Sequence, residues 1–386
     1  MNGYNHRLLG APDASLAAHV GSHGPLPRVA SVEQLASASE AAQLRGRGGA
    51  GFPMASKLRS LTGSGALLIA NGAEGEPLSS KDRTLLHRAP HLVLDGLAAI
   101  AAVTRPSRVV VLARPGDLYS VLGAAQERDD LNGLEVVEAS GAFVEGEASA
   151  ALQAVRGKLG VPVHHAHRLS SGDGKRGTAA LVQNVESLAT LALALRAFAG
   201  QGRVPSTRLY TVSGDVASPG VIEAAVGTSA EALALAAGGS TAGGFALVGG
   251  YHGRWVSGLD AALPGSAEAG AGIVHVVAAG RCPLDVVAAA MRTLAEASAG
   301  QCGPCRFGLP RIAGVVDQLA GFGAGQSVLR EAESLMRQVD GRGACAHPDG
   351  AVGFLRSSLE VLWDEFVHHS KGQCCCASLV TSGGVA

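Results

Sequence analysis

The spacing of apolar and polar residues changes along this chain, and each change predicts a different kind of structure. In the first half, short apolar runs of strand type at 66–70, 108–113 and 134–139 alternate with helical patterns at 90–104 and 117–129. Strands that alternate with helices are typical of a sheet covered by helices. We therefore expect an α/β domain here.

After residue 206 the pattern becomes one of short alternating strands. Residues 208–223 predict two strands about a Gly/Asp/Pro turn, followed by a helix at 229–237 and strands at 245–248 and 273–277. This arrangement suggests a small β-grasp module without a visible catalytic cluster.

The last part of the chain is helical. Helices are expected at 283–298, 309–319, 326–339 and 350–368, joined by short connections. Four helices of this length predict a bundle.

These patterns divide the chain into five segments. We expect a mobile leader at 1–30, where no period is visible, an α/β domain at 31–205, a β-grasp module at 206–280, a helical bundle at 281–370 and a cysteine-containing tail at 371–386.

Composition and charge exclude several classes of function. The net charge of −1 over 386 residues gives no reason to expect nucleic acid, and the longest uncharged run, 232–252, is interrupted by glycines, so we expect no membrane insertion. The first residues lack the apolar stretch of a signal peptide. All seven cysteines lie from Cys282 onwards, which favours metal or redox chemistry in a cytoplasmic protein.

A glycine-rich stretch from Leu44 to Pro53, L-R-G-R-G-G-A-G-F-P, is the first candidate site. Its backbone amides can approach a flat or anionic ligand, and cations stand beside it. The glycines are Gly46, Gly48, Gly49 and Gly51, and the cations are Arg45, Arg47 and Lys57. The spacing also fits a dinucleotide fingerprint, but a helix with Ser31 as its N-cap, not a strand, is predicted before it. A plain surface loop is the other alternative.

Further polar residues follow the predicted strand at 66–70, in the segment from Asn71 to Pro77. Polar residues at the end of a buried strand are where open α/β sheets bind ligands. Glu145 and Glu147 stand near the start of a predicted helix, where acids are also favoured simply by the helix dipole. The histidines at 164, 165 and 167 lack a firm metal-ligand spacing, which leaves solvated side chains as the simpler interpretation.

Three cysteines form the second candidate site. Cys302-x-x-Cys305 lies between the first two predicted helices of the bundle, and Cys345 lies just before the last. These places can meet at one end of a bundle and hold an iron–sulfur cluster; a zinc ion or reduced structural thiols are the alternatives.

Several of these segments together resemble one family. In chain order they are the glycine loop, N-G-A-E-G-E-P-x-x-x-K-D-R (71–83), P-H-L-V-L-D-G (90–96), Q-N-V-E-S-L-A (183–189), C-G-P-C-R-x-G (302–308) and G-R-x-x-C (341–345). This order resembles the NADH-binding flavoprotein subunit of respiratory complex I and related hydrogenase and formate dehydrogenase subunits. The resemblance implies an FMN-binding α/β domain, a ubiquitin-like β-grasp module and a helical bundle with a four-iron four-sulfur cluster.

The resemblance also implies roles for single residues. Phe52 and Glu76 match residues that touch the nicotinamide cofactor. The residues that match FMN contacts are Gly46, Arg47, Gly48, Lys57, Asn71, Glu74, Gly146, Glu147 and Asn184. A flavin accepts a hydride and passes its electrons singly to a cluster.

The chain departs from the family pattern on the nicotinamide side. Ala73 stands where the family has an aspartate, Phe143 where it has a tyrosine and Ala148 where it has a glutamate; aromatic residues are replaced near Ser60. Each lost hydrogen bond or stacking contact costs about 1 kcal/mol or more, which predicts weakened NADH binding.

The cluster motif departs as well, because Ala299 replaces its first cysteine. Cys302, Cys305 and Cys345 then predict a three-iron four-sulfur cluster or a four-iron cluster with another fourth ligand. The candidates are Ser298, Cys282, His347 and the run Cys374 to Cys376.

The resulting expectation is a cytoplasmic electron-transfer subunit that resembles an NADH dehydrogenase. Electrons pass from NADH through FMN to an iron–sulfur cluster and then to a ferredoxin-like or other iron–sulfur partner subunit. The alternative is a relay or scaffold subunit that has lost NADH binding, and a third, a zinc-stapled binding protein, requires the glycine loop to be incidental.

Overall fold

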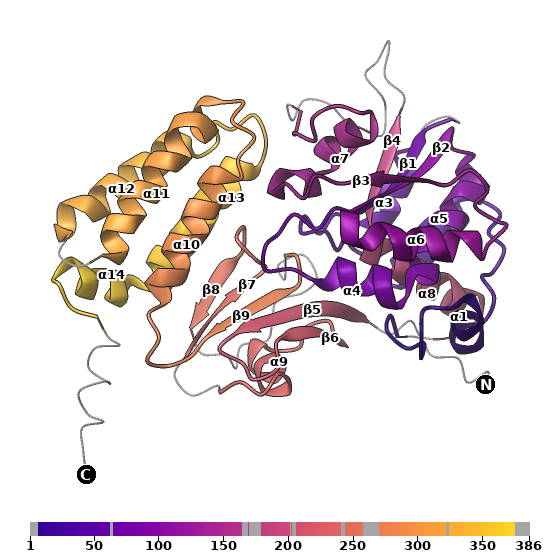
Figure 1. The fold of residues 1–386 in the computed structure, drawn as a ribbon, viewed down its shortest axis with the longest axis horizontal. Helices are drawn as coiled ribbons and strands as arrows, with labels where there is room; N and C mark the ends of the chain where they lie inside the picture. The colour runs from indigo at the N-terminus through magenta and orange to yellow at the C-terminus, as the bar shows by residue number, and fades with distance from the viewer. Residues whose placement is uncertain are drawn as a thin grey trace. The chain divides into compact units, whose positions relative to one another are not determined.

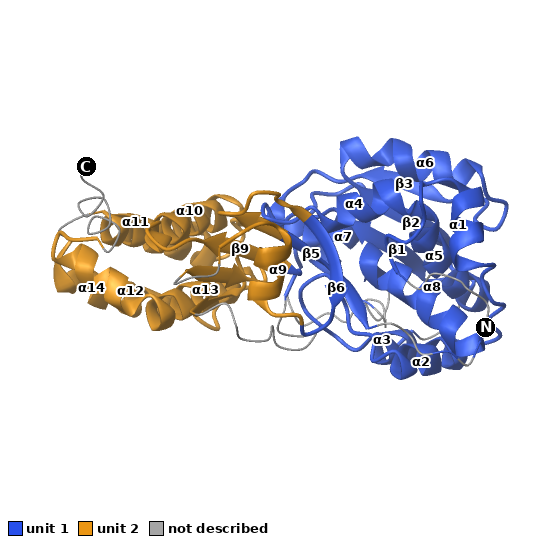
Figure 2. Cartoon of the chain, turned by 90° about the horizontal axis from the view of Figure 1, so that it is seen from below, with its two compact units in different colours: residues 1–211, 221–227, 264–272 blue, residues 212–220, 228–263, 273–386 orange. Residues whose placement is uncertain are grey.

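The computed structural model describes residues 7–61, 65–163, 169, 179–200, 202, 206–240, 244–257, 270–321 and 324–374. The chain divides into two compact units (Figure 2). Unit 1 contains residues 1–211, 221–227 and 264–272, and unit 2 contains residues 212–220, 228–263 and 273–386. The histidine-rich stretch at 164–168 lies outside the described residues.

Unit 1 is a mixed α/β unit built on a four-stranded parallel sheet with the order β3-β2-β1-β4. The strands are β1 (Leu67–Gly72), β2 (Arg108–Ala113), β3 (Glu135–Glu138) and β4 (Ala180–Asn184). The first three agree with the predicted strands. β4 has no predicted counterpart, because its apolar run is confined to residues 180–182 and gives way to the polar Gln183 and Asn184.

Helices cover both faces of this sheet (Figure 1). Alternate residues of β1 enter different cores: Leu68 packs with α5 (Pro90–Thr104) and α8 (Val185–Ala199), and Ile69 packs with α7 (Ala148–Val155). Burial on both faces is typical of a parallel sheet. The other helical elements of the unit are α1 (Leu16–His23), α2 (Val32–Ala41), α3 (Met54–Arg59), α4 (Lys81–Arg88), α6 (Leu118–Gln126) and the 3-10 turns η1 (Pro115–Asp117) and η2 (Phe143–Gly146).

The helix predicted at 90–104 is observed with these bounds. Pro90 occupies its first turn, and Arg105 ends it in the left-handed conformation, with φ at 47°. Gly96 allows α5 to pack closely on α8, since a Cβ at this position would lie 2.3 Å from the carbonyl oxygen of Leu188.

The expectation of a mobile leader is wrong for residues 7–30. This segment contains α1, and the backbone amide of Leu8 donates to a carboxylate oxygen of Glu223 at 2.8 Å. His19 is buried, with its Nε2 2.9 Å from Asp95 Oδ2. The segment is held by buried polar contacts with distant residues, which leave no trace in local periodicity.

A second sheet has five strands in the order β6-β5-β9-β7-β8, and β7 runs antiparallel to both neighbours. The elements are β5 (Thr207–Gly214), β6 (Gly220–Ala225), α9 (Ala230–Ala236), β7 (Phe245–Val248), β8 (Arg254–Ser257) and β9 (Ile273–Val277). The strands predicted at 245–248 and 273–277 have the observed bounds, whereas β8 has no predicted counterpart.

The C-terminal part of unit 2 is helical. It consists of α10 (Pro283–Glu296), the π-helical turn η4 (Pro304–Gly308), α11 (Leu309–Ala320), α12 (Gly325–Val339), α13 (His347–Val361) and α14 (Trp363–Ser370). The single helix expected at 350–368 is two helices, because the backbone breaks at Leu362. Cys345 therefore precedes α13 and not the last helix. Among the described helices, none has the length and apolar character needed to span a bilayer.

Candidate functional site

Two asparagines mark the carboxyl end of the parallel sheet. Asn71 on β1 and Asn184 on β4 are partners in the strand register, at the point where the strand order changes direction. Open α/β sheets bind ligands at such a switch point. Asn71 Nδ2 donates to the carbonyl oxygen of Gly146 at 3.1 Å, and Asn184 Oδ1 accepts from the amide of Glu186 at 3.0 Å, which caps α8. Both predicted residues are thus fixed at one edge.

The glycine-rich segment forms a narrow loop beside this edge. The amide of Gly46 donates to the carbonyl oxygen of Phe52 at 2.8 Å, and Gly49 has a φ of 109°, which favours glycine. Gly48 lies against Asn184, since an added Cβ would be 3.3 Å from the Asn184 Cβ. As predicted, a helix, α2, leads into the loop, so the ordinary dinucleotide fingerprint does not apply.

Arg47 carries hydrogen-bond donors that the described part of the protein leaves unused. Its side chain is buried, Nη2 lies 3.5 Å from the Thr207 carbonyl oxygen, and Nε and Nη1 have no hydrogen-bond partner among the described residues. Burial lowers the pKa of Arg47, and Glu186 opposes this shift. Because unpaired buried donors are costly, they indicate a place for an electron-rich ligand group.

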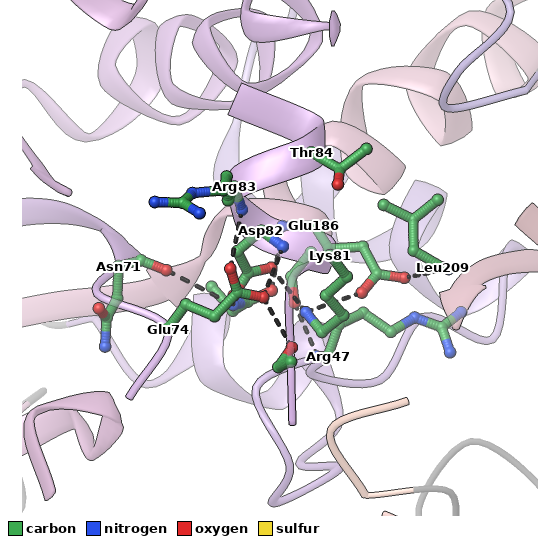
Figure 3. Close-up of polar contacts among 12 residues, drawn as sticks. Arg47, Asn71, Glu74, Lys81, Asp82, Arg83, Thr84, Glu186 and Leu209 are labelled. Carbon is green, nitrogen blue, oxygen red and sulfur yellow. Dashed lines mark hydrogen bonds and ion pairs between the residues drawn. The ribbon is translucent and has the colours of Figure 1, made fainter. Parts of the chain in front are cut away.

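A buried network of charged side chains, which the sequence did not predict, lies at the same carboxyl end of the sheet (Figure 3). Lys81 Nζ lies 2.6 Å from Asp82 Oδ1 and 3.0 Å from Glu186 Oε2. The other Asp82 oxygen accepts from Asn184 Nδ2 at 2.6 Å. Sequence segments 71–83 and 183–189 contained these residues, but only the fold brings their side chains together.

The charges of this network are compensated. Burial raises the pKa of Asp82 to about 7, and the Lys81 ammonium opposes that shift. Burial also acts against ionisation of Glu186, but Lys81, Arg208 and Arg47 outweigh it and lower the pKa of Glu186. The network therefore holds α4 and α8 together beneath the two asparagines.

Glu74, predicted as an FMN contact, has both carboxylate oxygens engaged by the protein. Oε1 accepts from the Asp82 amide at 2.9 Å and from Ser79 Oγ at 2.6 Å, and Oε2 accepts from the Arg83 amide at 3.0 Å. Its φ of 40° is unusual for a residue with a side chain. These contacts fix the start of α4.

The carboxylate of Glu147 is likewise engaged by main-chain amides, those of the helix that it precedes. Its side chain accepts from the amides of Ser149 and Ala150 at 3.0 and 3.1 Å and caps α7, which fits the alternative that this acid simply favours a helix start. Lys57 Nζ donates to the carbonyl oxygen of Val182 on β4, and burial lowers its pKa to about 8, against the effect of Glu147. Both side chains thus lie near the end of the sheet.

The two residues predicted to touch NADH lie towards the surface. Phe52 is 55% exposed, and Glu76 is partly exposed, with Oε1 accepting from the Leu78 amide at 3.4 Å. Gly75, next to Glu76 in the chain, passes so close to another segment that a Cβ would lie 2.5 Å from the carbonyl oxygen of Ala142.

The three predicted cluster cysteines meet in unit 2. The thiols of Cys302 and Cys305 are hydrogen-bonded, Cys345 is close enough to act on Cys305, and the Ser298 hydroxyl bonds to Cys305. Burial, followed by the influence of Cys302, raises the pKa of Cys305 to about 12, while the Ala344 and Cys305 amides outweigh burial and lower the pKa of Cys302.

The structure narrows the candidates for a fourth ligand. Cys282 precedes α10 and Cys302 follows it, so the length of this 14-residue helix separates them by about 21 Å. Cys374 lies beside Cys282 and is equally distant, while Cys375 and Cys376 lie outside the described residues. His347 Nε2 donates to the Leu294 carbonyl oxygen at 2.8 Å. The thiol rescue by Cys282 or Cys374 is therefore wrong, and Ser298 is the candidate in contact with a cluster thiol, that of Cys305.

Comparison with known families gives a consistent result. Residues 39–193 match the family described as the Nuo51 FMN-binding domain, and residues 285–369 match the NADH-ubiquinone oxidoreductase-F iron-sulfur binding region. The chain is a divergent member of the complex I flavoprotein family.

Relatives in this flavoprotein family are similar over most of their length. The F subunit of NADH-quinone oxidoreductase from Streptomyces coelicolor is 27% identical over 370 residues, covering 86% of this chain and 82% of the relative. The F 2 subunit of the same enzyme from Rhizobium meliloti is 29% identical over 377 residues, with 86% and 87% covered. Among solved structures, the NAD+-reducing [NiFe]-hydrogenase in the H2-reduced state matches with a TM-score of 0.78 and 26% identity, over 92% of this chain and 67% of that chain.

The departures from the flavoprotein family pattern fall on elements of the site. Ala73 follows β1 and is buried in the core cluster beneath the sheet, and Ala148 is the first residue of α7. Phe143 belongs to the turn η2. The polar groups expected by resemblance at these three positions are thus replaced by apolar side chains.

Proposed function

We propose that this protein is an electron-transfer oxidoreductase subunit that takes electrons from NADH through FMN to an iron–sulfur cluster and then to a protein acceptor. The observation that carries the proposal is the meeting of the glycine loop, Asn71 and Asn184 at the switch point of the sheet. The unpaired donors of Arg47 are buried beside this loop, towards Thr207. A flavin ring and a phosphate need a flat, accessible backbone surface and donors of this kind.

The residues of unit 1 suit FMN in different ways. Gly46 and Gly48 leave backbone accessible, Asn71 and Asn184 fix the carboxyl ends of β1 and β4 through their side-chain amides, and Arg47 supplies positive charge. We propose that the remaining contacts come from Lys57, Glu74, Gly146 and Glu147, with Phe52 and Glu76 facing the nicotinamide cofactor. When bound, FMN accepts two electrons as a hydride and releases them one at a time.

Glu74 and Glu147 act chiefly by positioning. Because their carboxylates are engaged by main-chain donors of α4 and α7, they fix the helix starts that border the site. Direct contact with a ligand would be made by the carboxylate oxygens' remaining lone pairs.

The cysteine site suits a cluster of iron and sulfide. Cys302, Cys305 and Cys345 provide three soft ligands, and the Ser298 hydroxyl, next to the position where Ala299 replaces the family cysteine, bonds to Cys305. We propose that this set holds either a three-iron cluster or a four-iron cluster with Ser298 as the fourth ligand.

We further propose the finer architecture. Residues 31–205 form the FMN-binding domain, 206–280 a ubiquitin-like β-grasp module, 281–370 a helical bundle around the cluster, and 371–386 a cysteine-containing tail. The five-stranded sheet with α9 and the helices α10 to α14 support this division. The proposed acceptor is a ferredoxin-like or other iron–sulfur subunit, with the cytoplasm as the proposed location.

A second candidate function is an electron relay or scaffold that has lost NADH binding. The burial of Ala73 in the apolar core and the position of Ala148 at the start of α7 favour it, because neither side chain offers a polar group to a nicotinamide cofactor.

An absorption spectrum of anaerobically purified protein, before and after NADH, separates these functions. Flavin bands with an iron–sulfur shoulder that bleach on adding NADH support the dehydrogenase. Cofactor bands that do not respond to NADH, in stopped-flow as well as at equilibrium, support the relay. A colourless protein with intact secondary structure contradicts the dehydrogenase and the relay and supports the scaffold.

A further inference from the structure

Three ligand-type side chains meet at the opposite end of α10 from the cluster cysteines. Cys282, His369 and Cys374 bring their Sγ, ring nitrogen and Sγ atoms within 4.8 Å of one another. The distance from Cys282 Sγ to His369 Nε2 is 3.4 Å. His369 is buried and both cysteines are partly buried, so the three atoms converge below the surface.

The orientation of His369 is fixed by the protein. Nδ1 lies 2.8 Å from the carbonyl oxygen of Ala320, to which it can only donate a hydrogen bond. The neutral ring then has its lone pair on Nε2, the atom that faces Cys282. A histidine whose other nitrogen donates to a backbone carbonyl is the usual arrangement at metal sites.

Cys282 lies at the N-terminus of α10, where main-chain amides help to stabilise a thiolate that is bound to a cation. It directly precedes α10, whose first turn contains Pro283, and the amides of Leu284 and Asp285 act on its sulfur. Without a cation, burial outweighs these amides and raises the pKa of the thiol to about 12. A divalent metal ion would displace this proton, because only the thiolate is a strong ligand.

The third ligand comes from the chain after α14. Cys374 lies four positions beyond the end of this helix, which contacts both α10 and α11. A disulfide would involve Cys282 and Cys374 alone. The His369 ring, held with its lone pair towards Cys282, supplies a third ligand atom, which favours a metal site over a disulfide. Two thiolates and one imidazole are a set that zinc accepts.

We propose that Cys282, His369 and Cys374 bind one zinc ion, which fastens the segment after α14 to the first turn of α10. Among the described residues these are the three protein ligands of the site, so water or another ligand completes the tetrahedron. Zinc binding releases the two thiol protons and involves no electron transfer. The site is separate from the cluster cysteines, about one α10 length away.

Metal analysis of the complete, anaerobically purified protein tests the proposal. We expect about one zinc per chain, lost in Cys282→Ser and in His369→Gln, with the iron content unchanged. The matched control is Cys302→Ser, which removes a cluster thiol and should lower iron while zinc stays. Unchanged iron in the first two variants also shows that unit 2 is folded. Zinc that persists in Cys282→Ser, or that disappears together with iron in Cys302→Ser, would overturn the assignment.

Cobalt titration of zinc-depleted wild-type protein provides a test that needs no variant. Bound cobalt should produce thiolate-to-metal charge-transfer bands at about one equivalent, and added zinc should abolish them. Wild-type protein that takes up neither ion, or that contains a disulfide between Cys282 and Cys374 after reduction and anaerobic handling, contradicts the proposal. The outcome of the cobalt titration does not depend on flavin content, so it tests the zinc site separately from the proposed dehydrogenase function.

Discussion

Replacing Lys81 by methionine tests whether the buried charge network supports the proposed flavin site. Methionine keeps most of the length of the side chain but removes the cation between Asp82 and Glu186. The ammonium lies 2.6 and 3.0 Å from their carboxylate oxygens, and the three side chains are 1%, 6% and 0% exposed. No water-exposed surface is available to stabilise the carboxylates left behind.

The expected cost follows from this burial. Removing one partner of a buried ion pair destabilises a protein by about 3–5 kcal/mol, because an uncompensated charge remains. The matched control is Arg108→Met, which breaks a pair with Glu135 whose side chains are 38% and 43% exposed. Exposed pairs contribute about 0–1 kcal/mol. The two variants should therefore differ by about 3 kcal/mol in local stability.

The deficit should also depend on pH. In the wild type, Lys81 is the largest of the influences that lower the pKa of Glu186 against the effect of burial. In Lys81→Met, burial is opposed by Arg208, Arg47 and the Leu209 amide without the ammonium, and we expect the pKa of Glu186 to rise above the value in the unfolded chain. A carboxyl with a raised folded pKa must take up a proton on folding, which costs more as pH rises above the unfolded value of about 4. The deficit of the variant should grow between about pH 5.5 and about pH 8, by about 1.4 kcal/mol for each pH unit over which Glu186 stays protonated.

Hydrogen–deuterium exchange followed by mass spectrometry measures the local stability of α4 and α8 in the wild type and in the variant. Peptides from α4 and α8 should lose protection in Lys81→Met, while peptides from α10 in unit 2 serve as an internal control. A deficit below about 1 kcal/mol, or one that does not change with pH, would refute the argument that these charges are buried and mutually compensated. Addition of the glutamine substitution at Glu186 should recover part of the loss.

Three further predictions follow from other parts of the structure. Gly48→Val should lower FMN occupancy about tenfold, because its Cβ would crowd the asparagine on β4. Gly123→Ala, with open space around the glycine, should retain FMN. Flavin absorbance per chain measures the occupancy of both variants, and equal FMN retention in the two would contradict the proposed site. Cys302→Ser should reduce iron per chain and change the electron paramagnetic resonance spectrum, and Cys282→Ser should change neither; loss of iron in the second variant would contradict two separate thiol sites. Asp95→Asn should cost about 3–5 kcal/mol near neutral pH. Despite burial, His19, Arg196 and Arg128 hold the pKa of Asp95 well below its usual range, so its stabilisation is complete above about pH 4 and is lost on acidification; urea unfolding at several pH values should show the wild-type advantage shrinking below that pH.

Local pattern was sufficient for much of the fold. The helix at 90–104 and the strands at 108–113, 245–248 and 273–277 have the bounds that the sequence predicts. Each is long or apolar enough for its own period to be visible. The cap of α2 at Ser31 was also predictable, because a serine hydroxyl that accepts from the amide three residues later is a local contact.

The order of the motifs identified the candidate residues but not the contacts that their side chains make. Asn71 and Asn184 could be named from the sequence, and the register of β1 and β4 then places them side by side. Glu74 and Glu147 could also be named, yet only the structure shows that main-chain donors engage their carboxylates. A role inferred by position does not reveal which groups surround a side chain.

The tertiary structure alone decided the contacts between distant segments. Lys81 meets Glu186 across more than a hundred residues, and Cys282 meets His369 across nearly ninety. Neither pairing has a local signature, because a charge or a thiol in a short segment looks the same whether it will be solvated or buried. The sequence determined which groups this protein carries, and burial in a common core determined which of them act together.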